Sequence, residues 1–134
     1  MAELKYLLDT SICIELLNGN HRVRQYCIDN AQSCAISTLT VIELLYGAYN
    51  APEKYREKEL EKARLLIKFY PVISIDDTPD AFCLEKVRLS RMGNSIEDFD
   101  LLIGITAKVN DMIMITHNRK HMCRIEGLLV DDWC

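Results

Sequence analysis

The sequence has 134 residues, of which 49% are hydrophobic and 27% are charged, a composition that is typical of globular domains and excludes a disordered chain. Acidic residues outnumber basic ones by 20 to 16, which gives a formal charge of -4. Proteins that coat duplex nucleic acid carry a basic surface, so the charge excludes that class. The length predicts a single domain that spans residues 1–134.

Cysteine usage and the N-terminus both bear on the cellular compartment. The six cysteines are scattered and include no C-x-x-C pair, so neither a zinc motif nor a redox motif is indicated. The N-terminal segment reaches Asp9 after a very short apolar run, which predicts neither a signal peptide nor a membrane span. These features indicate a soluble cytoplasmic protein with free thiols.

Short apolar runs alternate with helical patterns along the chain. The first half predicts a strand at 5–8, a helix that ends near 18–19, a helix at 23–30, a strand at 35–37 and a helix at about 40–49. The second half predicts a helix at about 54–69, a strand at 71–75, a helix at 78–93, a helix at about 97–109, a strand at 112–116 and a short strand at 128–130.

Strands that are each followed by a helix indicate a parallel sheet covered on both faces. We therefore expect an α/β fold, a three-layer α/β/α sandwich with a mainly parallel central sheet of four to five strands. Right-handed crossovers place the carboxyl ends of such strands along one edge of the sheet. Ligands bind at that edge in open sheets of this kind.

Three acidic residues are predicted to lie at this edge. Asp9 follows the first strand, Glu43 lies in the first turn of the helix after the second strand, and Asp100 lies near the start of a later helix. Each also has a simpler explanation. Asp9 fits a helix cap, and Thr40-x-x-Glu43 and Ser95-x-x-Asp98 fit capping boxes. Acids in the first turn of a helix, such as Asp100, are also favoured by the helix dipole. Both interpretations stay open for a single site.

The apolar neighbours of Glu43 and Asp100 favour a metal site. The two acids lie within Val-Ile-Glu-Leu-Leu and Phe-Asp-Leu-Leu-Ile, where an uncompensated carboxylate is costly. Several carboxylates together also repel one another. A divalent ion offsets both effects, and oxygen ligands select Mg²⁺ or Mn²⁺.

Four segments occur in an order that resembles a known family. They are Tyr6-Leu-Leu-Asp-Thr-Ser-Ile12, Ser37-Thr-Leu-Thr-Val-Ile-Glu-Leu-Leu-Tyr-Gly47, Asp100-Leu-Leu-Ile-Gly-Ile-Thr-Ala107, and Thr116-His-Asn-Arg-Lys-His-Met122 with a later Trp133. Together they resemble the PIN-domain endoribonucleases, and specifically the VapC-type toxins of toxin–antitoxin pairs. The resemblance covers nearly the whole chain.

The resemblance implies a metal-dependent endoribonuclease that hydrolyses RNA phosphodiester bonds. Asp9, Glu43 and Asp100 match the family's catalytic, metal-binding acids, and Mg²⁺ or Mn²⁺ is the implied cofactor. Asp98 is an additional candidate ligand, provided that its helix begins only at Phe99, because residues two apart on a helix do not face the same way.

Supporting positions follow from the same resemblance. Thr10, Thr116 and Asn118 match small polar residues of the family's site. Arg119, with the neighbouring bases Lys120 and Arg124, is expected to offset phosphate charge.

One position departs from the family pattern. Members commonly carry a fourth acid a few residues after the Thr-x-Asn motif, and His121 stands there in this chain. A histidine there binds a softer metal, contacts phosphate or lies on the surface; these alternatives stay open. The departure puts a second metal ion in doubt and motivates the alternative of a non-catalytic RNA-binding or partner-binding PIN-like module.

The remaining expectations concern an alternative class of protein and the binding partners. A phosphoacceptor receiver domain would fit the size, but it requires paired acids after the first strand and a lysine after the last, and neither is evident. The family resemblance implies an RNA substrate, a cognate antitoxin protein that reaches the acidic site with Arg or Lys, and a homodimer formed through helices around 42–49 and 60–70.

Overall fold

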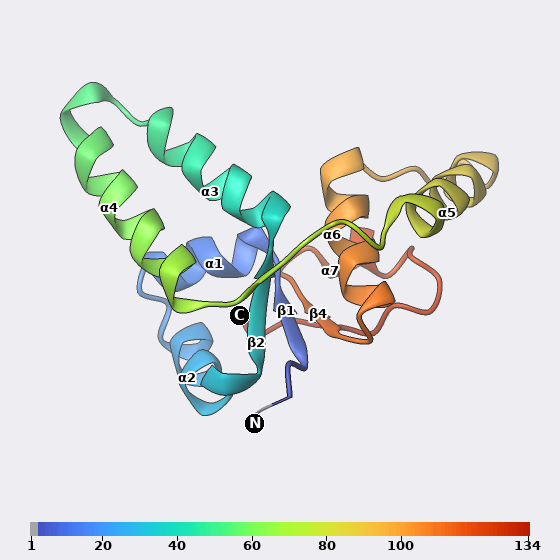
Figure 1. The fold of residues 1–134 in the computed structure, drawn as a ribbon, viewed down its shortest axis with the longest axis horizontal. Helices are drawn as coiled ribbons and strands as arrows, with labels where there is room; N and C mark the ends of the chain where they lie inside the picture. Colours follow the sequence, from blue (N-terminus) through green and yellow to red (C-terminus); the bar gives the residue numbers. More distant parts are fainter. Residues whose placement is uncertain (1–2) are drawn as a thin grey trace.

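The centre of the molecule is a parallel β-sheet. The computed structural model describes residues 3–134, so residues 1 and 2 of the N-terminal segment lie outside the described part. Five strands pair in the order β3-β2-β1-β4-β5, and every pair is parallel. They are β1 (Tyr6–Leu8), β2 (Cys34–Ser37), β3 (Val72–Ile73), β4 (Ile113–Ile115) and β5 (Val130–Asp131). The three central strands β2, β1 and β4 lie side by side in Figure 1. The expected α/β sandwich with a parallel sheet is confirmed.

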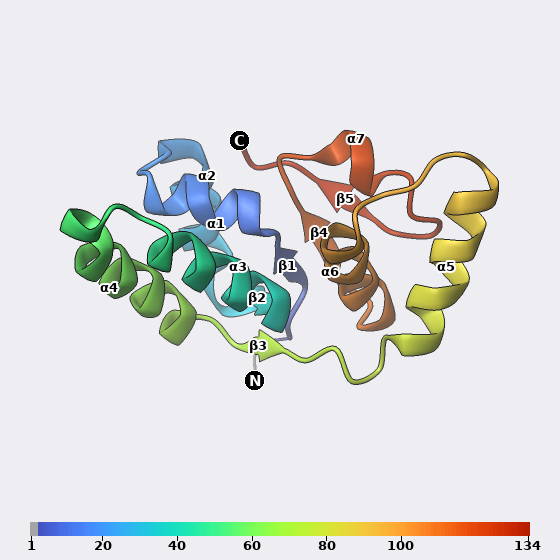
Figure 2. The ribbon, with the colours of Figure 1, turned by 90° about the horizontal axis from the view of Figure 1, so that it is seen from above.

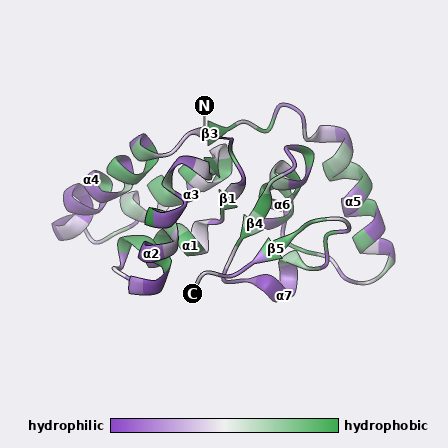
Figure 3. Ribbon diagram, turned by 90° about the horizontal axis from the view of Figure 1, so that it is seen from below, coloured by the Kyte–Doolittle hydropathy of each residue, from purple (hydrophilic) through white to green (hydrophobic). Residues whose placement is uncertain are grey.

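Helices cover both faces of this sheet. One face carries α1 (Thr10–Leu17), α2 (His21–Asp29), α3 (Thr38–Tyr49) and α4 (Glu53–Phe69), and the other carries α5 (Pro79–Arg91), α6 (Asp98–Val109) and the short α7 (Arg119–Met122). Figure 2 shows the two groups on opposite sides of the strands. In Figure 3 the strands and the inward sides of the helices are the hydrophobic parts of the ribbon.

The alternation of side chains along each strand fills two separate cores. Leu7 and Leu8 are both fully buried, but Leu8 packs with Ile12 beneath α1, whereas Leu7 packs with Leu101 beneath α6. Successive side chains of a strand point to opposite faces, so a strand with helices on both faces is apolar throughout. This explains why the strands are continuous apolar runs in the sequence.

The direction of strand addition reverses between β1 and β4. From β1 the chain adds β2 and β3 on one side, and later adds β4 and β5 on the other. Crevices for ligands form at such switch points, outside the carboxyl ends of the strands. Leu8 is paired with Ile115 across this point, so Asp9 and Thr116 leave the sheet side by side.

The predicted elements are confirmed, with shifts at their ends. The strand predicted at 71–75 stops at Ile73, because the chain turns there: the Thr78 hydroxyl donates to the carbonyl of Ile75 at 2.6 Å. The last strand lies at 130–131 rather than at 128–130. The 3-10 turn Ala31–Ser33 and α7 are too short for a periodic signal and were not predicted. Within residues 3–134, no helix is long and apolar enough to cross a membrane.

Candidate active site

Asp9 lies at the switch point, between the end of β1 and the first turn of α1. Its side chain caps α1 by accepting a hydrogen bond from the backbone N–H of Thr10 at 2.8 Å, so the capping role is real. Its other oxygen accepts a hydrogen bond from the Thr116 hydroxyl at 2.7 Å. The side chain is therefore fixed both from the start of α1 and from the end of β4, and only 5% of the residue is exposed.

The surroundings of Asp9 disfavour its charged form. Burial raises the pKa of Asp9, hydrogen bonds from Thr116 and Thr10 lower it, and the negative charge of Glu43 raises it. The net shift is upward. A carboxylate in this position gains from a cation at the same site, because the cation offsets both the burial and the repulsion.

Glu43 reaches the same place from α3. This helix begins at Thr38 with Ser37 as its cap, and the Ser37 hydroxyl accepts the Thr40 N–H at 3.1 Å. The prediction of a capping box Thr40-x-x-Glu43 is therefore wrong. Glu43 lies in the second turn of the helix rather than the first. Its Oε1 accepts a hydrogen bond from the Thr10 hydroxyl at 2.6 Å instead, which joins Glu43 to the residue beside Asp9.

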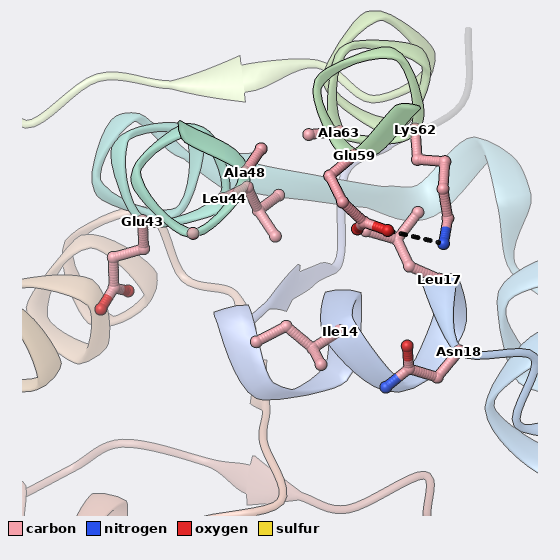
Figure 4. Close-up of a pocket in the computed structure, with 10 residues that line it drawn as sticks. Ile14, Leu17, Asn18, Glu43, Leu44, Ala48, Glu59, Lys62 and Ala63 are labelled. Carbon is pink, nitrogen blue, oxygen red and sulfur yellow. Dashed lines mark ion pairs between the residues drawn. The ribbon is translucent and has the colours of Figure 1, made fainter. Parts of the chain in front are cut away.

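A small hollow extends from Glu43 between α1, α3 and α4. Its volume is about 130 Å³, and Ile14 and Leu44 contribute apolar walls. Figure 4 shows the Glu43 carboxylate pointing away from the ion pair that Glu59 and Lys62 form on α4. Glu43 is thus directed toward the acidic site, and Lys62 does not neutralise it.

Asp100 enters the site from the first turn of α6. Burial raises the pKa of Asp100, and the charges of Asp9 and Glu97 raise it further, whereas His121 lowers it. Asp100 is therefore within electrostatic range of Asp9, and His121 is within electrostatic range of Asp100. Asp9 and Glu43 are thus joined through Thr10, and Asp100 faces them from α6 with His121 beside it. Within residues 3–134, the ligand atoms of the three acids do not all lie within 4.8 Å of one another.

The donor set of this cluster fits a hard divalent cation. Three carboxylates come from separate elements, and burial together with neighbouring negative charges raises the pKa of Asp9 and of Asp100. Oxygen donors of this kind suit Mg²⁺ or Mn²⁺, which retain open positions for water and phosphate.

Asp98 is not brought into the cluster. The α6 helix begins at Asp98, not at Phe99, and Glu97 precedes it without a side-chain cap. The Asp98 carboxylate forms an exposed ion pair with Lys86 of α5 at 2.9 Å. Asp98 was a candidate ligand only if the helix began at Phe99, and this condition is not met. The prediction of a capping box Ser95-x-x-Asp98 is also wrong.

The segment after β4 supplies the polar border of the site. The Thr116 hydroxyl, besides donating to Asp9, accepts the backbone N–H of Asn118 at 2.9 Å. Arg119 lies exposed at the start of α7. The Arg124 guanidinium donates to the carbonyl of Ser95 at 3.0 Å, which holds it at the α5–α6 connection.

Two hydroxyl groups of the site were not predicted. The Thr40 hydroxyl is fully buried and lies 3.1 Å from the Thr10 hydroxyl. The Ser11 hydroxyl lies 3.4 Å from Asp9 Oδ2 and accepts the backbone N–H of His117 at 3.1 Å. The sequence did contain a signal for them, because hydroxyl residues follow directly after the first two strands. In the structure, hydroxyl groups of these segments orient the neighbouring acids.

An acidic site at the switch point of a small parallel α/β sandwich defines the class of this protein. The family model described as PIN domain matches residues 6–128, and the chain belongs to the PIN-domain family.

Within this family, the chain is similar to proteins of the VapC type. The chain is 32% identical to the tRNA(fMet)-specific endonuclease VapC of Salmonella typhimurium, covering 98% of this chain and 99% of that protein. It is 30% identical to the protein of the same name from Shigella flexneri, over 97% and 98% of the two chains. A crystal structure of DNA-bound VapBC from Salmonella typhimurium superposes with a TM-score of 0.91 at 27% identity, covering 98% of this chain and 99% of that one. The resemblance to VapC-type proteins is confirmed.

Proposed function

We propose that this chain is a Mg²⁺- or Mn²⁺-dependent endoribonuclease and the toxin of a toxin–antitoxin pair. One observation carries the proposal: Thr116 and Thr10 hold the carboxylates of Asp9 and Glu43 at 2.7 and 2.6 Å. Hydroxyl groups that fix the orientation of neighbouring acids are typical of a prearranged metal site. The VapC relatives are named as endonucleases or ribonucleases, which supports this reaction class.

The proposed roles follow the position of each side chain. Asp9, Glu43 and Asp100 hold the cation. A bound divalent ion supplies positive charge to the scissile phosphate and lowers the pKa of water. Asp100, which is only half-buried, accepts the proton of the attacking water. Attack displaces the ribose 3′-oxygen, so the products carry a 5′-phosphate and a 3′-hydroxyl.

The proposed substrate is a folded RNA with an accessible single-stranded loop. Single strands expose backbone and bases that a duplex hides. The relatives from Salmonella typhimurium and Shigella flexneri are named as specific for tRNA(fMet), so initiator tRNA is the first substrate to test. Arg119 and Lys120, both exposed beside the site, offset the phosphate charge.

The proposed antitoxin contact is an apolar groove on the α1–α2–α4 side. The groove has a volume of about 560 Å³ and is lined by apolar side chains that include Leu65 and Phe69, with Arg24 and Lys62 also on its wall. Leu65 is 64% and Phe69 67% exposed. Such a groove fits an apolar antitoxin segment that carries acidic residues at its sides, and the VapBC complexes among the structural neighbours support a protein occupant.

The antitoxin contact is tested by co-expression with the neighbouring gene's product. Leu65→Asp and Phe69→Asp are expected to abolish protection by that product while RNA cleavage persists. Leu84→Asp on α5 is the matched control, because Leu84 is 73% exposed and lies on the opposite side of the sheet. Protection that survives in both groove variants contradicts this contact.

We also propose a homodimer that uses the exposed apolar face of α3. Ile42, Tyr46 and Tyr49 are 47%, 69% and 53% exposed. Exposed aromatic side chains on one helix are typical of a protein interface. Sedimentation analysis of Tyr46→Asp should show a monomer where the unmodified chain is dimeric, and an unchanged mass would contradict this face.

The nuclease proposal is tested with purified protein, initiator tRNA and Mg²⁺ or Mn²⁺. Asp9→Asn and Glu43→Gln should each abolish cleavage while circular dichroism and melting show a folded chain. Glu59→Gln is the control, since Glu59 pairs only with Lys62 on α4. Full activity in either acid variant would overturn the assignment.

The same assay separates the alternative of a non-catalytic module. The observation behind that alternative is His121, which stands where the family carries an acid. A module would bind RNA, measured by fluorescence anisotropy, without releasing fragments at any metal concentration. Cleavage that requires Asp9 excludes it.

A further inference from the structure

A second cluster of ligating side chains lies on the outer side of the β4–β5 edge. His117 follows β4, and Asp132 and Cys134 follow β5. The His117 Nδ1 lies 3.1 Å from Asp132 Oδ2, and Asp132 Oδ1 accepts the backbone N–H of Cys134 at 2.8 Å. The three residues thus converge although the sequence separates His117 from the other two.

The spacing of the three ligand atoms suits a tetrahedral metal ion. The imidazole nitrogen, the carboxylate oxygen and the thiol sulfur all lie within 4.8 Å of one another. Within residues 3–134, this is the only group of three His, Cys, Asp or Glu ligands that is so close. Bonds of about 2.0–2.3 Å place the ligands of a tetrahedral zinc roughly 3.5 Å apart, so small side-chain rotations close the site.

The backbone around the cluster is held on both sides. Trp133, between two of the ligands, is 2% exposed, stacks on Tyr26 and meets Tyr6 edge to face, each with ring centroids 5.2 Å apart. The His117 N–H donates to the Ser11 hydroxyl at 3.1 Å. A frame of this kind fixes ligand positions before a metal binds.

The cluster is distinct from the acidic site. Thr116 is buried and faces Asp9, whereas the next side chain, His117, is 59% exposed. Its donors also differ: a nitrogen, an oxygen and a sulfur select zinc or a similar soft ion, while the three carboxylates select Mg²⁺ or Mn²⁺.

We propose that His117, Asp132 and Cys134 form a binding site for a soft divalent cation, with Zn²⁺ as the natural occupant. The thiol of Cys134 loses its proton to solvent when the sulfur–metal bond forms, and water completes the fourth position. The bound ion links the segment after β4 to the segment after β5. It thereby stiffens the border of the acidic site without entering it.

The test adds Co²⁺, a coloured substitute for Zn²⁺, to the full chain. A thiolate–cobalt charge-transfer absorption in the near ultraviolet should appear at one equivalent, disappear on addition of Zn²⁺, and be accompanied by quenching of Trp133, the only tryptophan. Cys134→Ser should abolish the absorption, and His117→Ala should weaken Co²⁺ binding at least about tenfold.

Two controls isolate the cluster from the other thiols and from the nuclease. Cys83→Ser removes an exposed thiol outside the cluster and should retain the absorption. An Asp9→Asn variant, inactive if the proposed function holds, should also retain it, so the two proposals fail separately. Zn²⁺ should raise the melting temperature of the unmodified chain but not that of Cys134→Ser.

Three results overturn the proposal. The first is a charge-transfer absorption that persists in Cys134→Ser, which would place the metal on another thiol. The second is the absence of any absorption in the unmodified chain with excess Co²⁺. The third is an unchanged Co²⁺ affinity in His117→Ala, which would reduce the His117–Asp132 contact to a surface ion pair.

Discussion

The Thr116 hydroxyl donates a hydrogen bond of 2.7 Å to the carboxylate of Asp9 across the switch point of the sheet, although the two residues are 107 positions apart in the chain. The parallel register of β1 and β4 places these residues side by side. The bond fixes the rotamer of Asp9 and stabilises its charged form against burial. The position of the acid therefore depends on the pairing of two strands rather than on its own helix alone.

Loss of the Thr116 hydroxyl should lower the rate of RNA cleavage more than it lowers the stability of the fold. Thr116→Val keeps the shape of a fully buried side chain but removes the hydroxyl that donates to Asp9 Oδ2 and accepts the Asn118 N–H. We expect RNA cleavage to fall about 10- to 100-fold and the Mn²⁺ concentration for half-maximal rate to rise. Thr116→Ser retains the hydroxyl and should keep most of the activity, and equal loss in both variants would contradict this role.

The two acids at the start of α6 should behave differently. Asp100 interacts with Asp9, whereas Asp98 pairs with Lys86 at the surface. Asp100→Asn should abolish cleavage, and Asp98→Asn should leave the rate within about twofold of the unmodified chain, because exposed ion pairs contribute little. Initial rates on the same tRNA at saturating Mg²⁺ measure both variants. If the Asp98→Asn variant is folded but inactive, Asp98 does contribute to the site and the assignment is wrong.

The difference between these acids shows what the sequence could predict. Strand and helix positions, the parallel sheet and the assignment of Asp9, Glu43 and Asp100 to one edge of it all follow from apolar runs and their order. The fate of Asp98 depends on one residue at a helix start, and helix boundaries are weakly encoded. Likewise, the cluster of His117, Asp132 and Cys134 carries no sequence motif, because the pairing of β4 with β5 brings it together.

His121 provides a test of the missing fourth acid. The interaction with His121 lowers the pKa of Asp100, so His121 occupies the border of the acidic site. His121→Asp adds a carboxylate there and should lower the Mg²⁺ concentration for half-maximal cleavage several-fold, because cation affinity rises with ligand charge. His21→Asp, an exposed histidine on α2, is the control and should leave the Mg²⁺ dependence unchanged. Equal Mg²⁺ requirements in both variants would show that the side chain at position 121 does not contribute to metal binding.

Two helical glycines should respond in opposite directions to alanine. A Cβ at Gly104 of α6 would overlap the buried side chain of Ile125 and press on Met122 Sδ at 3.3 Å, while a Cβ at Gly47 of α3 meets nothing within 4 Å. Gly104→Ala should lower the free energy of unfolding by about 1–2 kcal/mol, and Gly47→Ala should raise it by about 0.5–1 kcal/mol. Urea unfolding measures both, and a stabilised Gly104→Ala would contradict the tight packing of α6.

Glu85 should make stability depend on pH. It is 5% exposed, accepts two hydrogen bonds from Arg88 at 2.7 and 2.8 Å and one from the backbone N–H of Glu126 at 2.7 Å. The hydrogen bonds from Arg88 lower the pKa of Glu85 below its ordinary value of 4.5, against the opposing effect of burial. A group whose pKa is lowered by folding stabilises the native state above its unfolded pKa, and this stabilisation is lost as pH falls through the folded value.

Glu85→Gln should therefore lower the free energy of unfolding by about 1–3 kcal/mol at pH 7, and this difference from the unmodified chain should shrink as pH falls below 4.5. Urea unfolding at a series of pH values measures the difference. Glu126→Gln is the matched control: its side chain is 72% exposed and lies 3.5 Å from Arg88, so its removal should change stability little at any pH. A Glu85→Gln deficit that stays constant down to pH 3 would show that packing, and not the charge of Glu85, links α5 to the segment after α7.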